Sequence, residues 1–373
     1  MGEESNQEQR YQEKFSREEK AMAKQGRKIA TAKDRSKFKK TDRKMVQKAE
    51  APVSQEHLLR GRVLSIMSQG IIVEHDSGTF ACILRGIIKK EKNQQKNLVA
   101  VGDFVLFEKT HEAEGVIAYI EPRRSVLSRA DNLSRRKEQL IATNIDQVLI
   151  TLSVVRPPMK QSIVDRYIIA TRKGNMEPVI VINKMDLLDN EAYPQEFREA
   201  EREICEQFVA AYRQAGIPVI CMSATTGEGL DDLCAVMRDK ASVFSGQSGV
   251  GKSSLINSVS GYDLRVGEIV EKTKKGSHTT TTAQLLKLKF GGYCIDTPGI
   301  KSFGLWQLTR EEIEKYFPDI HEVGLNCKYQ DCRHLHEQDC AVLEAIDREE
   351  LSFMRYESYQ FLIESLDQEH KNR

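Results

Sequence analysis

The hydrophobic and polar positions change their pattern twice along the chain. Up to about residue 52 the sequence is rich in Gln, Glu and Lys and has almost no hydrophobic periodicity, which predicts a segment without stable structure of its own. From Leu58 onwards, short runs of β-type residues are separated by turn residues. The five runs are Gly61–Met67, Gly70–Glu74, Thr79–Leu84, Asp103–Glu108 and Gly115–Ile120. Five short strands in such a stretch predict a small barrel, of which the OB-fold is the best-known form and an SH3-like barrel the alternative.

Beyond Pro122-Arg123-Arg124 the pattern becomes one of alternating strands and helices. Continuous apolar runs are typical of strands buried on both faces of a parallel sheet, and amphipathic stretches between them indicate helices. The expected strands are Gln147–Ser153, Pro178–Ile182, Pro218–Met222, Ser242–Phe244, Leu285–Phe290 and Tyr293–Ile295. The expected helices are Val164–Lys173, Glu196–Ala215, one from Leu230, and Lys252–Val259. This order predicts a mostly parallel sheet covered by helices on both sides.

From Thr309 the chain is expected to be helical, beginning with a Thr309-x-x-Glu312 capping box. The changes of pattern together predict a multidomain protein. Its parts are an N-terminal extension over 1–52, an all-β barrel over 53–124, an α/β domain over 125–306 and a small, mostly α domain over 307–373. No apolar run is long enough to span a membrane, and no apolar core of a secretory signal follows the N-terminal charges, so we expect no membrane partner.

Charge is divided unevenly along the chain. Between Lys20 and Lys48 twelve Lys and Arg stand against two acids, so this segment carries +10 and the remainder −9 of the overall +1. A basic arm on an acidic body indicates a polyanionic partner such as nucleic acid, with a disordered solubilising tail as the alternative. The eight cysteines, in a chain without a recognisable signal, predict reduced thiols and a cytoplasmic protein.

A phosphate-binding loop lies between an apolar strand and a helix. Gly246-Gln247-Ser248-Gly249-Val250-Gly251-Lys252-Ser253 matches G-x-x-x-x-G-K-[ST]. Backbone N–H groups of such a loop, with Ser254 in the first helical turn, can surround phosphate oxygens. Lys252 can reach the β- and γ-phosphates, and the Ser253 hydroxyl can bind Mg²⁺.

Two further motifs, each after a buried strand, indicate guanine as the base. Asn183-Lys184-Met185-Asp186 follows one strand and Ser223-Ala224-Thr225 follows the next. The Asp186 carboxylate can accept two hydrogen bonds from guanine N1–H and N2–H₂, which adenine cannot donate. The Lys184 stem can lie across the base, Asn183 can brace the loops, and a backbone N–H of Ser223-Ala224 can meet guanine O6. We therefore expect GTP rather than ATP.

The residues expected to respond to the γ-phosphate come later in the chain. Asp296-Thr297-Pro298-Gly299 follows a short strand, so Asp296 can hold Mg²⁺ through water and the Gly299 N–H can contact the γ-phosphate. Gly276–Thr282 contains four consecutive threonines, and Thr280 is the favoured one to complete the Mg²⁺ shell. The alternative is that the threonines only begin the next strand.

The hydrolytic residue is less evident. Ile300 follows the D-x-x-G motif, where many GTPases carry a Gln that orients the attacking water, and an apolar side chain cannot do this. His278, in the expected switch loop, is the nearest alternative, since a partner that orders the loop could bring it to the γ-phosphate. The other interpretation is a surface histidine.

A metal site is indicated near the C-terminus. Cys327-x₄-Cys332-x-His334-x₅-Cys340 offers three thiolates and an imidazole, the ligand set of a closed tetrahedral zinc site. A structural Zn²⁺ is therefore expected. A zinc enzyme is disfavoured, because four protein ligands leave no position for an activated water.

The order of these motifs differs from that of ordinary GTPases, in which the phosphate loop comes first. Here the guanine-reading motifs precede it. With a small barrel before and the Cys/His cluster after, the chain over about residues 57–365 resembles the RsgA/YjeQ family of ribosome small-subunit-dependent GTPases. The resemblance implies an OB-fold, a circularly permuted GTPase domain and a zinc domain. It also implies a cytoplasmic bacterial enzyme that hydrolyses GTP in late 30S maturation, contacts 16S rRNA and is stimulated by the subunit.

The family's site residues match this sequence position by position, with two departures. Its phosphate loop falls on Gly246–Ser253, its base-reading motif on Asn183, Lys184 and Asp186, and its zinc ligands on Cys327, Cys332, His334 and Cys340. Family members often carry Gly-Arg-His-Thr-Thr in the switch, whereas this chain has Ser277 in place of that Arg while keeping His278. The long charged extension is the second departure.

Two interpretations of the nucleotide remain. In the first, a monomeric enzyme hydrolyses GTP to GDP and phosphate as a release switch on the 30S subunit. In the second, the chain is an RNA-binding assembly scaffold in which the nucleotide is mainly structural. Because the segment from Gly299 to Trp306 leads directly into the zinc domain, we also expect γ-phosphate contacts to set the position of that domain.

Overall fold

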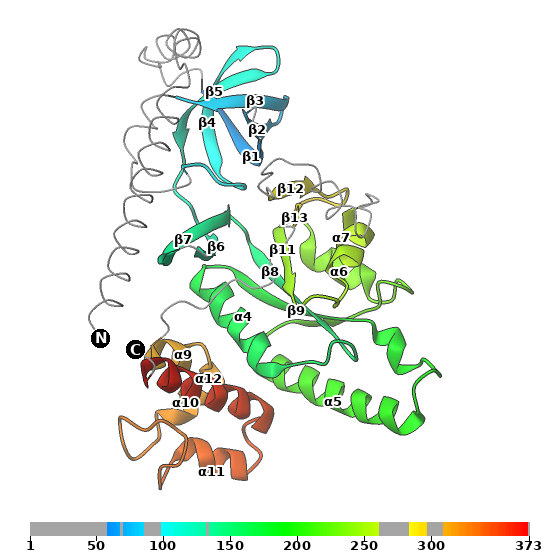
Figure 1. Cartoon of the computed structure of the whole chain (residues 1–373), viewed down its shortest axis with the longest axis vertical. Coiled ribbons are helices and arrows are strands. Elements are labelled where there is room, and N and C mark those ends of the chain that lie inside the picture. The colour runs from blue at the N-terminus through cyan, green and yellow to red at the C-terminus, as the bar shows by residue number, and fades with distance from the viewer. Residues whose placement is uncertain are drawn as a thin grey trace, which may run out of the picture. The chain divides into compact units, whose positions relative to one another are not determined.

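The computed structural model describes residues 58–67, 70–85, 98–131, 134–260, 283–296 and 309–371, whose elements are labelled in Figure 1. The basic extension and the expected switch residues Gly276–Thr282 lie outside the described residues, as do residues 297–308. In the described part of the chain, no helix combines the length and the apolar character needed to cross a membrane.

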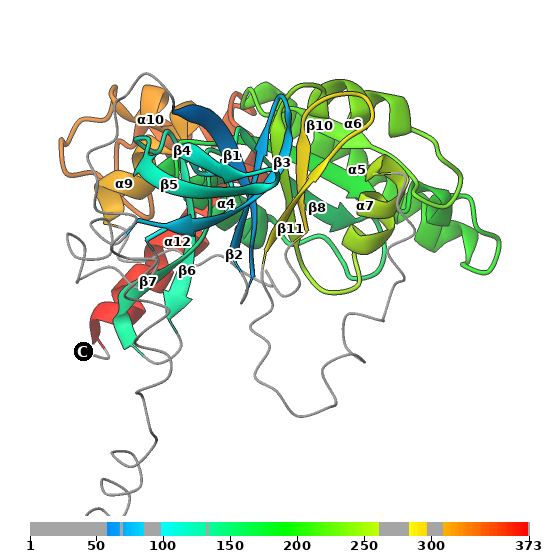
Figure 2. The ribbon, with the colours of Figure 1, turned by 90° about the horizontal axis from the view of Figure 1, so that it is seen from above.

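The first five strands, blue to cyan in Figure 2, close into a barrel consistent with an OB-fold. They are β1 (Leu59–Met67), β2 (Gly70–His75), β3 (Gly78–Leu84), β4 (Phe104–His111) and β5 (Glu114–Ile120). Strand β1 pairs antiparallel with both β2 and β4, β3 pairs antiparallel with β2 and parallel with β5, and β4 pairs with β5. Alternate residues such as Val63, Val73 and Phe107 fill the interior, because successive side chains of a strand point to opposite faces.

The α/β part contains the expected sheet. Its strands are β8 (Gln147–Ser153), β9 (Glu177–Asn183), β10 (Val219–Cys221), β11 (Ala241–Gly246), β12 (Gln284–Lys287) and β13 (Tyr293–Asp296). They lie in the order β10-β9-β8-β11-β13-β12, and all pairs are parallel except β12–β13. Strand β12 is shorter than predicted, because a hydrogen-bonded turn from Leu288 to Gly292 follows Lys287, with positive φ at Gly291 and Gly292.

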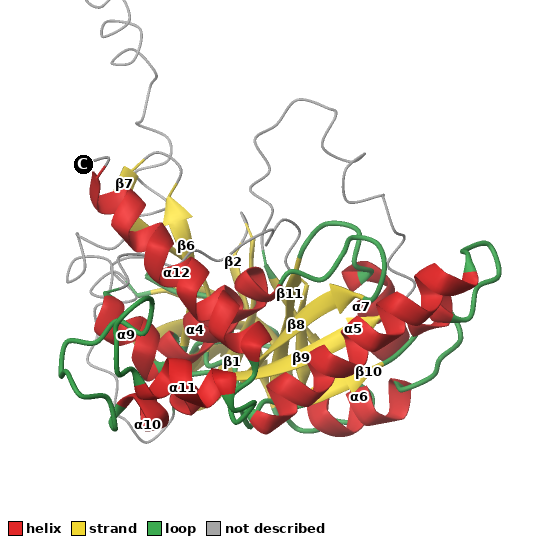
Figure 3. Cartoon of the chain, turned by 90° about the horizontal axis from the view of Figure 1, so that it is seen from below, coloured by secondary structure: helices red, strands yellow, loops and turns green. Residues whose placement is uncertain are grey.

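Helices cover both faces of this sheet (Figures 1 and 3). The helices are α4 (Gln161–Lys173), α5 (Gln195–Gln214), α6 (Leu230–Met237) and α7 (Lys252–Ser260). Val148 and Ile150 of β8 share a core with residues of α4 and α5. Leu149, between them in the sequence, shares another core with residues of α6 and α7. Successive side chains of one buried strand therefore point into two separate cores.

A two-stranded hairpin between the barrel and the sheet was not predicted. It is formed by β6 (Val126–Asp131) and β7 (Ser134–Thr143). Its sequence is polar and basic over most of its length, so it lacks the alternation that marks a half-buried strand. Leu127 and Ala142 at its base are buried in the core of the α/β part, which anchors the hairpin by contacts remote in sequence.

Four helices follow residue 309. They are α9 (Arg310–Lys315), α10 (Pro318–Gly324), α11 (Ala341–Asp347) and α12 (Phe353–Lys371). The predicted capping box is present, since the Thr309 hydroxyl accepts from the Glu312 N–H and the Glu312 carboxylate accepts from the Thr309 N–H. Helix α12 packs against α4 and α5, and Figure 1 shows the three together.

A buried arginine joins these helices to the α/β part. Arg355 of α12 is 1% exposed, forms an ion pair with Asp165 of α4 and contacts Asp319 of α10 at 3.2 Å. Its guanidinium also lies 4.3 Å from the centre of the Phe317 ring. Burial raises the pKa of Asp165, and the positive charge of Arg355 opposes that rise. Arg355 is therefore the cation that both carboxylates share, while the Tyr212 hydroxyl also donates to Asp165 at 2.9 Å.

We expect Arg355→Met to destabilise the packing of α12 on α4 by about 3–5 kcal/mol, because it leaves the buried Asp165 carboxylate without its cationic partner. The measurement is the opening free energy of α12 amides from hydrogen exchange. Arg348→Met is the matched control, since Arg348 pairs with Glu350 at the surface, and it should change that free energy by less than about 0.5 kcal/mol. Equal effects of the two substitutions would contradict the role assigned to Arg355.

Candidate functional site

Three loops with the predicted nucleotide motifs meet at one edge of the sheet. They follow the carboxyl ends of β9, β10 and β11. Strands β9 and β10 are parallel neighbours, and β8 lies between β9 and β11 and is parallel to both. Loops at the carboxyl ends of parallel strands lie at the same edge, where α/β folds bind their ligands. The motif order along the chain therefore does not matter to the geometry of the edge.

The Asn183 side chain connects all three loops. It is 1% exposed, and its Nδ2 donates to the Val250 carbonyl of the phosphate loop at 2.9 Å. Its Oδ1 accepts from the Ala224 N–H at 3.0 Å. A Cβ at Gly251 would collide with the Asn183 amide, and Gly251 has a φ of +98°. Both the close contact and the backbone conformation therefore require glycine at this position. These two hydrogen bonds are the contacts that the predicted bracing role of Asn183 would require.

Lys184 and Asp186 are held in specific positions beside Asn183. Lys184 adopts a left-handed conformation with φ 67°, and its Nζ donates to the Gly249 carbonyl at 2.6 Å. Burial lowers the pKa of Lys184, although Asp186 opposes the shift. The Asp186 Oδ1 accepts a hydrogen bond of 2.5 Å from the Ser223 hydroxyl, which orients the carboxylate. Its remaining lone pairs can accept from a ligand.

The phosphate loop leads from β11 into α7. Lys252 begins α7, and its Nζ donates to the carbonyls of Gly246 and Gln247 at 2.8 and 2.6 Å. Burial lowers the pKa of Lys252, because the charged form loses hydration. An anion beside this ammonium would offset that loss, and the N-terminus of α7 adds partial positive charge.

The structure brings together the predicted residues that lie in its described part. These are Asn183, Lys184, Asp186, Ser223, Ala224, Gly246, Gln247, Ser248, Gly249, Val250, Gly251, Lys252, Ser253 and Ser254. The other predicted residues, His278, Thr280 and Gly299, fall outside the described residues, and so does the side chain of Asp296.

A residue missed in the sequence also borders this edge. The Arg156 carbonyl, in the loop after β8, accepts from Lys184 Nζ at 2.7 Å, and the Arg156 guanidinium lies 5.5 Å from the centre of the Tyr193 ring. The sequence signal was available, because Arg156 follows a buried strand that ends at the same edge.

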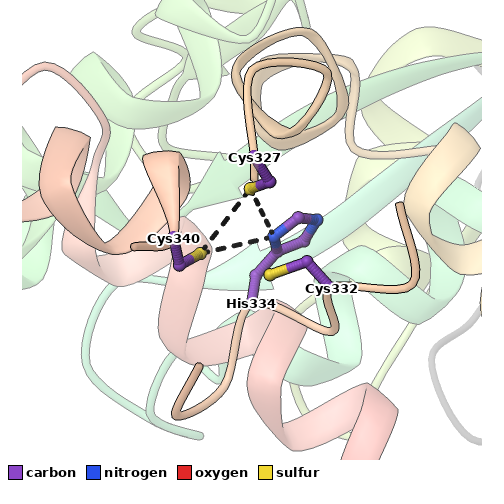
Figure 4. A group of neighbouring side chains, drawn as sticks. All are labelled: Cys327, Cys332, His334 and Cys340. Carbon is purple, nitrogen blue, oxygen red and sulfur yellow. Dashed lines mark hydrogen bonds between the residues drawn. The ribbon is translucent and has the colours of Figure 1, made fainter. Parts of the chain in front are cut away.

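A second cluster lies among the C-terminal helices (Figure 4). The ligand atoms of Cys327, Cys332, His334 and Cys340 all lie within 4.8 Å of one another. Cys327 Sγ and Cys340 Sγ are 3.8 Å apart, and each lies 3.5 Å from His334 Nδ1. Ligands around a tetrahedral zinc would stand roughly 3.8 Å apart for two sulfurs and roughly 3.5 Å for sulfur and nitrogen. The cluster therefore fits one metal ion, with Nδ1 as the histidine ligand.

Side chains outside the cluster contact the residues that form it. His334 Nε2 faces away from the sulfurs and lies 3.9 Å from Glu314 Oε1, beyond hydrogen-bond distance. Arg310 donates to the Cys332 carbonyl. The Glu337 carboxylate accepts from the N–H groups of Arg333 and Leu335 at 2.8 Å, which holds the loop around His334.

Comparisons with known proteins agree with this arrangement. A family model described as RsgA GTPase matches residues 120–306. The small ribosomal subunit biogenesis GTPase RsgA of Chlorobaculum parvum is 41% identical over 286 residues, which cover 74% of this chain and 88% of that protein. The protein of the same name from Actinobacillus succinogenes is 37% identical over 319 residues, covering 84% and 86%.

Two solved structures are similar over most of their length. The crystal structure of YjeQ from Thermotoga maritima has a TM-score of 0.65 and 32% identity, covering 83% of this chain and 98% of that one. YloQ, described as a circularly permuted GTPase, has a TM-score of 0.64 and 28% identity, covering 86% and 99%. The family model spans half of the chain and these relatives match it over most of their own length, so the chain belongs to the RsgA GTPase family.

Proposed function

We propose that this chain hydrolyses GTP to GDP and phosphate while bound to the small ribosomal subunit, and that hydrolysis releases it late in subunit maturation. The observation that supports nucleotide binding is the position of the Asn183 amide, which joins the phosphate loop to both proposed guanine-reading loops. The partner follows from relatives named small ribosomal subunit biogenesis GTPase. We place the chain in the cytoplasm as a monomer that contacts 16S rRNA.

The proposed roles divide between base and phosphates. Asp186, oriented by Ser223, accepts from guanine N1–H and N2–H₂, and Lys184 covers the base. The N–H groups from Gly246 to Ser254 hold the phosphates, and Lys252 neutralises charge that develops between the β- and γ-phosphates. Positioning and electrostatic stabilisation of this kind supply most of the rate in phosphoryl transfer.

The proposal assigns three further roles: Mg²⁺ binding, contact with the γ-phosphate and orientation of the attacking water. Mg²⁺ bound with GTP, held by Ser253, Thr280 and Asp296, would neutralise phosphate charge. The Gly299 N–H contacts the γ-phosphate. His278 orients the attacking water once the ribosomal partner orders its loop.

The Cys₃His cluster is proposed to hold one structural Zn²⁺. Thiolate and imidazole ligands at tetrahedral spacing favour zinc, and a bound ion would connect the loop before α11 to the core shared by Phe317, Tyr359 and Cys332. A small domain gains much of its stability from such an ion.

The decisive test of the proposed function is GTP turnover with and without purified 30S subunits. We expect the subunit to raise turnover of the unmodified chain by at least about tenfold, with no turnover for Lys252→Ala. His278→Ala should keep GTP affinity and lose the stimulation. Tight subunit binding with unchanged turnover would instead favour the RNA-binding scaffold, in which the nucleotide is mainly structural.

Base recognition is tested by Asp186→Asn. The amide donates a hydrogen bond where guanine requires an acceptor, so GTP affinity should fall by about 10²-fold or more, while xanthosine triphosphate, with an oxygen at position 2, should bind better. Fluorescent analogues of both nucleotides measure this. Asp189→Asn is the matched control, because Asp189 pairs with Arg202 at the surface. Retention of guanine preference by Asp186→Asn would exclude the assigned role.

The metal assignment is tested by Cys340→Ser. We expect one Zn²⁺ per unmodified chain after dialysis, and near-complete loss from the variant in the presence of a chelator, since one of four ligands is weakened. Elemental analysis together with the melting temperature gives the result. Cys234→Ser, which changes a half-buried thiol of α6, should retain the ion. Full zinc retention by Cys340→Ser would disprove the site.

A further inference from the structure

The barrel is joined to the GTPase sheet by strand pairing. Strand β1 pairs antiparallel with β12, with Ser65 opposite Gln284, and Gln284 in turn stands opposite Asp296 of β13. One row of residues therefore runs from the barrel to the aspartate that begins the D-x-x-G motif. In the sequence, Gln284 also comes two residues after the run of threonines. The barrel thus contacts the two strands from which both γ-phosphate motifs extend.

A carboxylate of the barrel strengthens this connection. Glu74 of β2 accepts a 2.5 Å hydrogen bond from the Tyr293 hydroxyl of β13 and a 2.8 Å hydrogen bond from Lys287 Nζ of β12. Tyr293 and Lys287 face each other in the β12–β13 register. Burial alone would raise the pKa of Glu74, but these two hydrogen bonds and the positive charges of Lys287 and Arg62 together lower that pKa. An ionised carboxylate therefore holds both strands.

Tyr293 is held from a second side by the barrel. The Arg62 guanidinium of β1 lies 4.7 Å from the centre of the Tyr293 ring and 5.1 Å from that of Phe104. Arg62 also donates to the Asn144 carbonyl at 2.7 Å. A movement of Tyr293 would break the contacts with Glu74 and Arg62 together, so β13 and the barrel are expected to shift as one unit.

The C-terminal helices are attached elsewhere. Arg355 and the helix that carries it pack on α4 and α5, and these helices precede and follow the strand that ends at Asn183. The route expected from the sequence, from the γ-phosphate to the zinc domain, runs through residues outside the described range. The described contacts lead from the γ-phosphate strands to the barrel.

We propose that Glu74 is a positioning residue for the γ-phosphate half of the nucleotide site, and that through Tyr293 and Lys287 it couples the state of the barrel to the preference for GTP over GDP. The inference rests on the proposed function for the identity of the nucleotide. Such coupling is reciprocal, so a partner that binds the barrel changes GTP affinity by the same factor as GTP changes affinity for that partner. Glu74 itself does not contact the nucleotide.

The test uses the full chain without ribosomes. The affinities for GDP and for a non-hydrolysable GTP analogue are measured for the unmodified chain, Glu74→Ala and Tyr293→Phe. We expect GDP affinity to stay within about twofold and analogue affinity to fall at least about fivefold, the lower end of common allosteric couplings. Glu121→Ala is the matched control, because Glu121 is a barrel carboxylate that pairs with Arg60 of the barrel itself. It should leave both affinities unchanged.

A double variant distinguishes coupling from loss of structure. If Glu74 acts through Tyr293, the Glu74→Ala/Tyr293→Phe chain should lose no more analogue affinity than the more affected single variant. Equal losses of GDP and analogue affinity would mean a structural role alone and would overturn the proposal, as would unchanged affinities in both single variants. If 30S subunits did not stimulate the unmodified chain, the proposed function would be wrong. The ratio of analogue affinity to GDP affinity could still be measured and would still test the role of Glu74.

Discussion

The hydrogen bonds of the Asn183 side chain are the interaction on which the nucleotide site depends. One buried amide donates to Val250 and accepts from Ala224, so it holds three loops that are far apart in the chain. Each of these loops begins where a parallel strand ends, and the amide sets the distances between them. Since a buried amide without partners would be costly, the loops and Asn183 stabilise one another.

This arrangement explains how a permuted chain keeps a GTPase site. Strand neighbours in the sheet determine which loops meet, whereas chain order determines what is attached to each half. The barrel pairs with β12, one of the two strands next to the proposed γ-phosphate residues. The C-terminal helices pack on α4 and α5, which precede and follow the strand leading to the proposed guanine-reading residues, with Arg355 at the contact. Each half of the site therefore carries one flanking domain, which allows the flanks to respond differently to the γ-phosphate.

Local patterns in the sequence predicted much of this structure. Buried strands such as Gln147–Ser153 and motifs such as Asn183–Asp186 depend on residues close together in the chain, so periodicity and spacing are sufficient to find them. The β6–β7 hairpin was not predicted, because its sequence is polar and its anchoring contacts are remote in sequence. The buried Arg355 was not predicted, because a charged residue is expected at the surface and its burial depends on partners remote in sequence. The pairing of Glu74 with Tyr293 was missed for the same reason.

The central claim is that the γ-phosphate acts on the barrel and that the guanine-reading half stays unchanged. Hydrogen exchange of the full chain with GDP and with a non-hydrolysable GTP analogue tests it most directly. The account predicts that amides of β12, β13 and the β1 residues near Ser65 exchange more slowly with the analogue, while those of α4 and α12 do not change. Equal exchange in β1 with both nucleotides, or a change confined to α12, would contradict it.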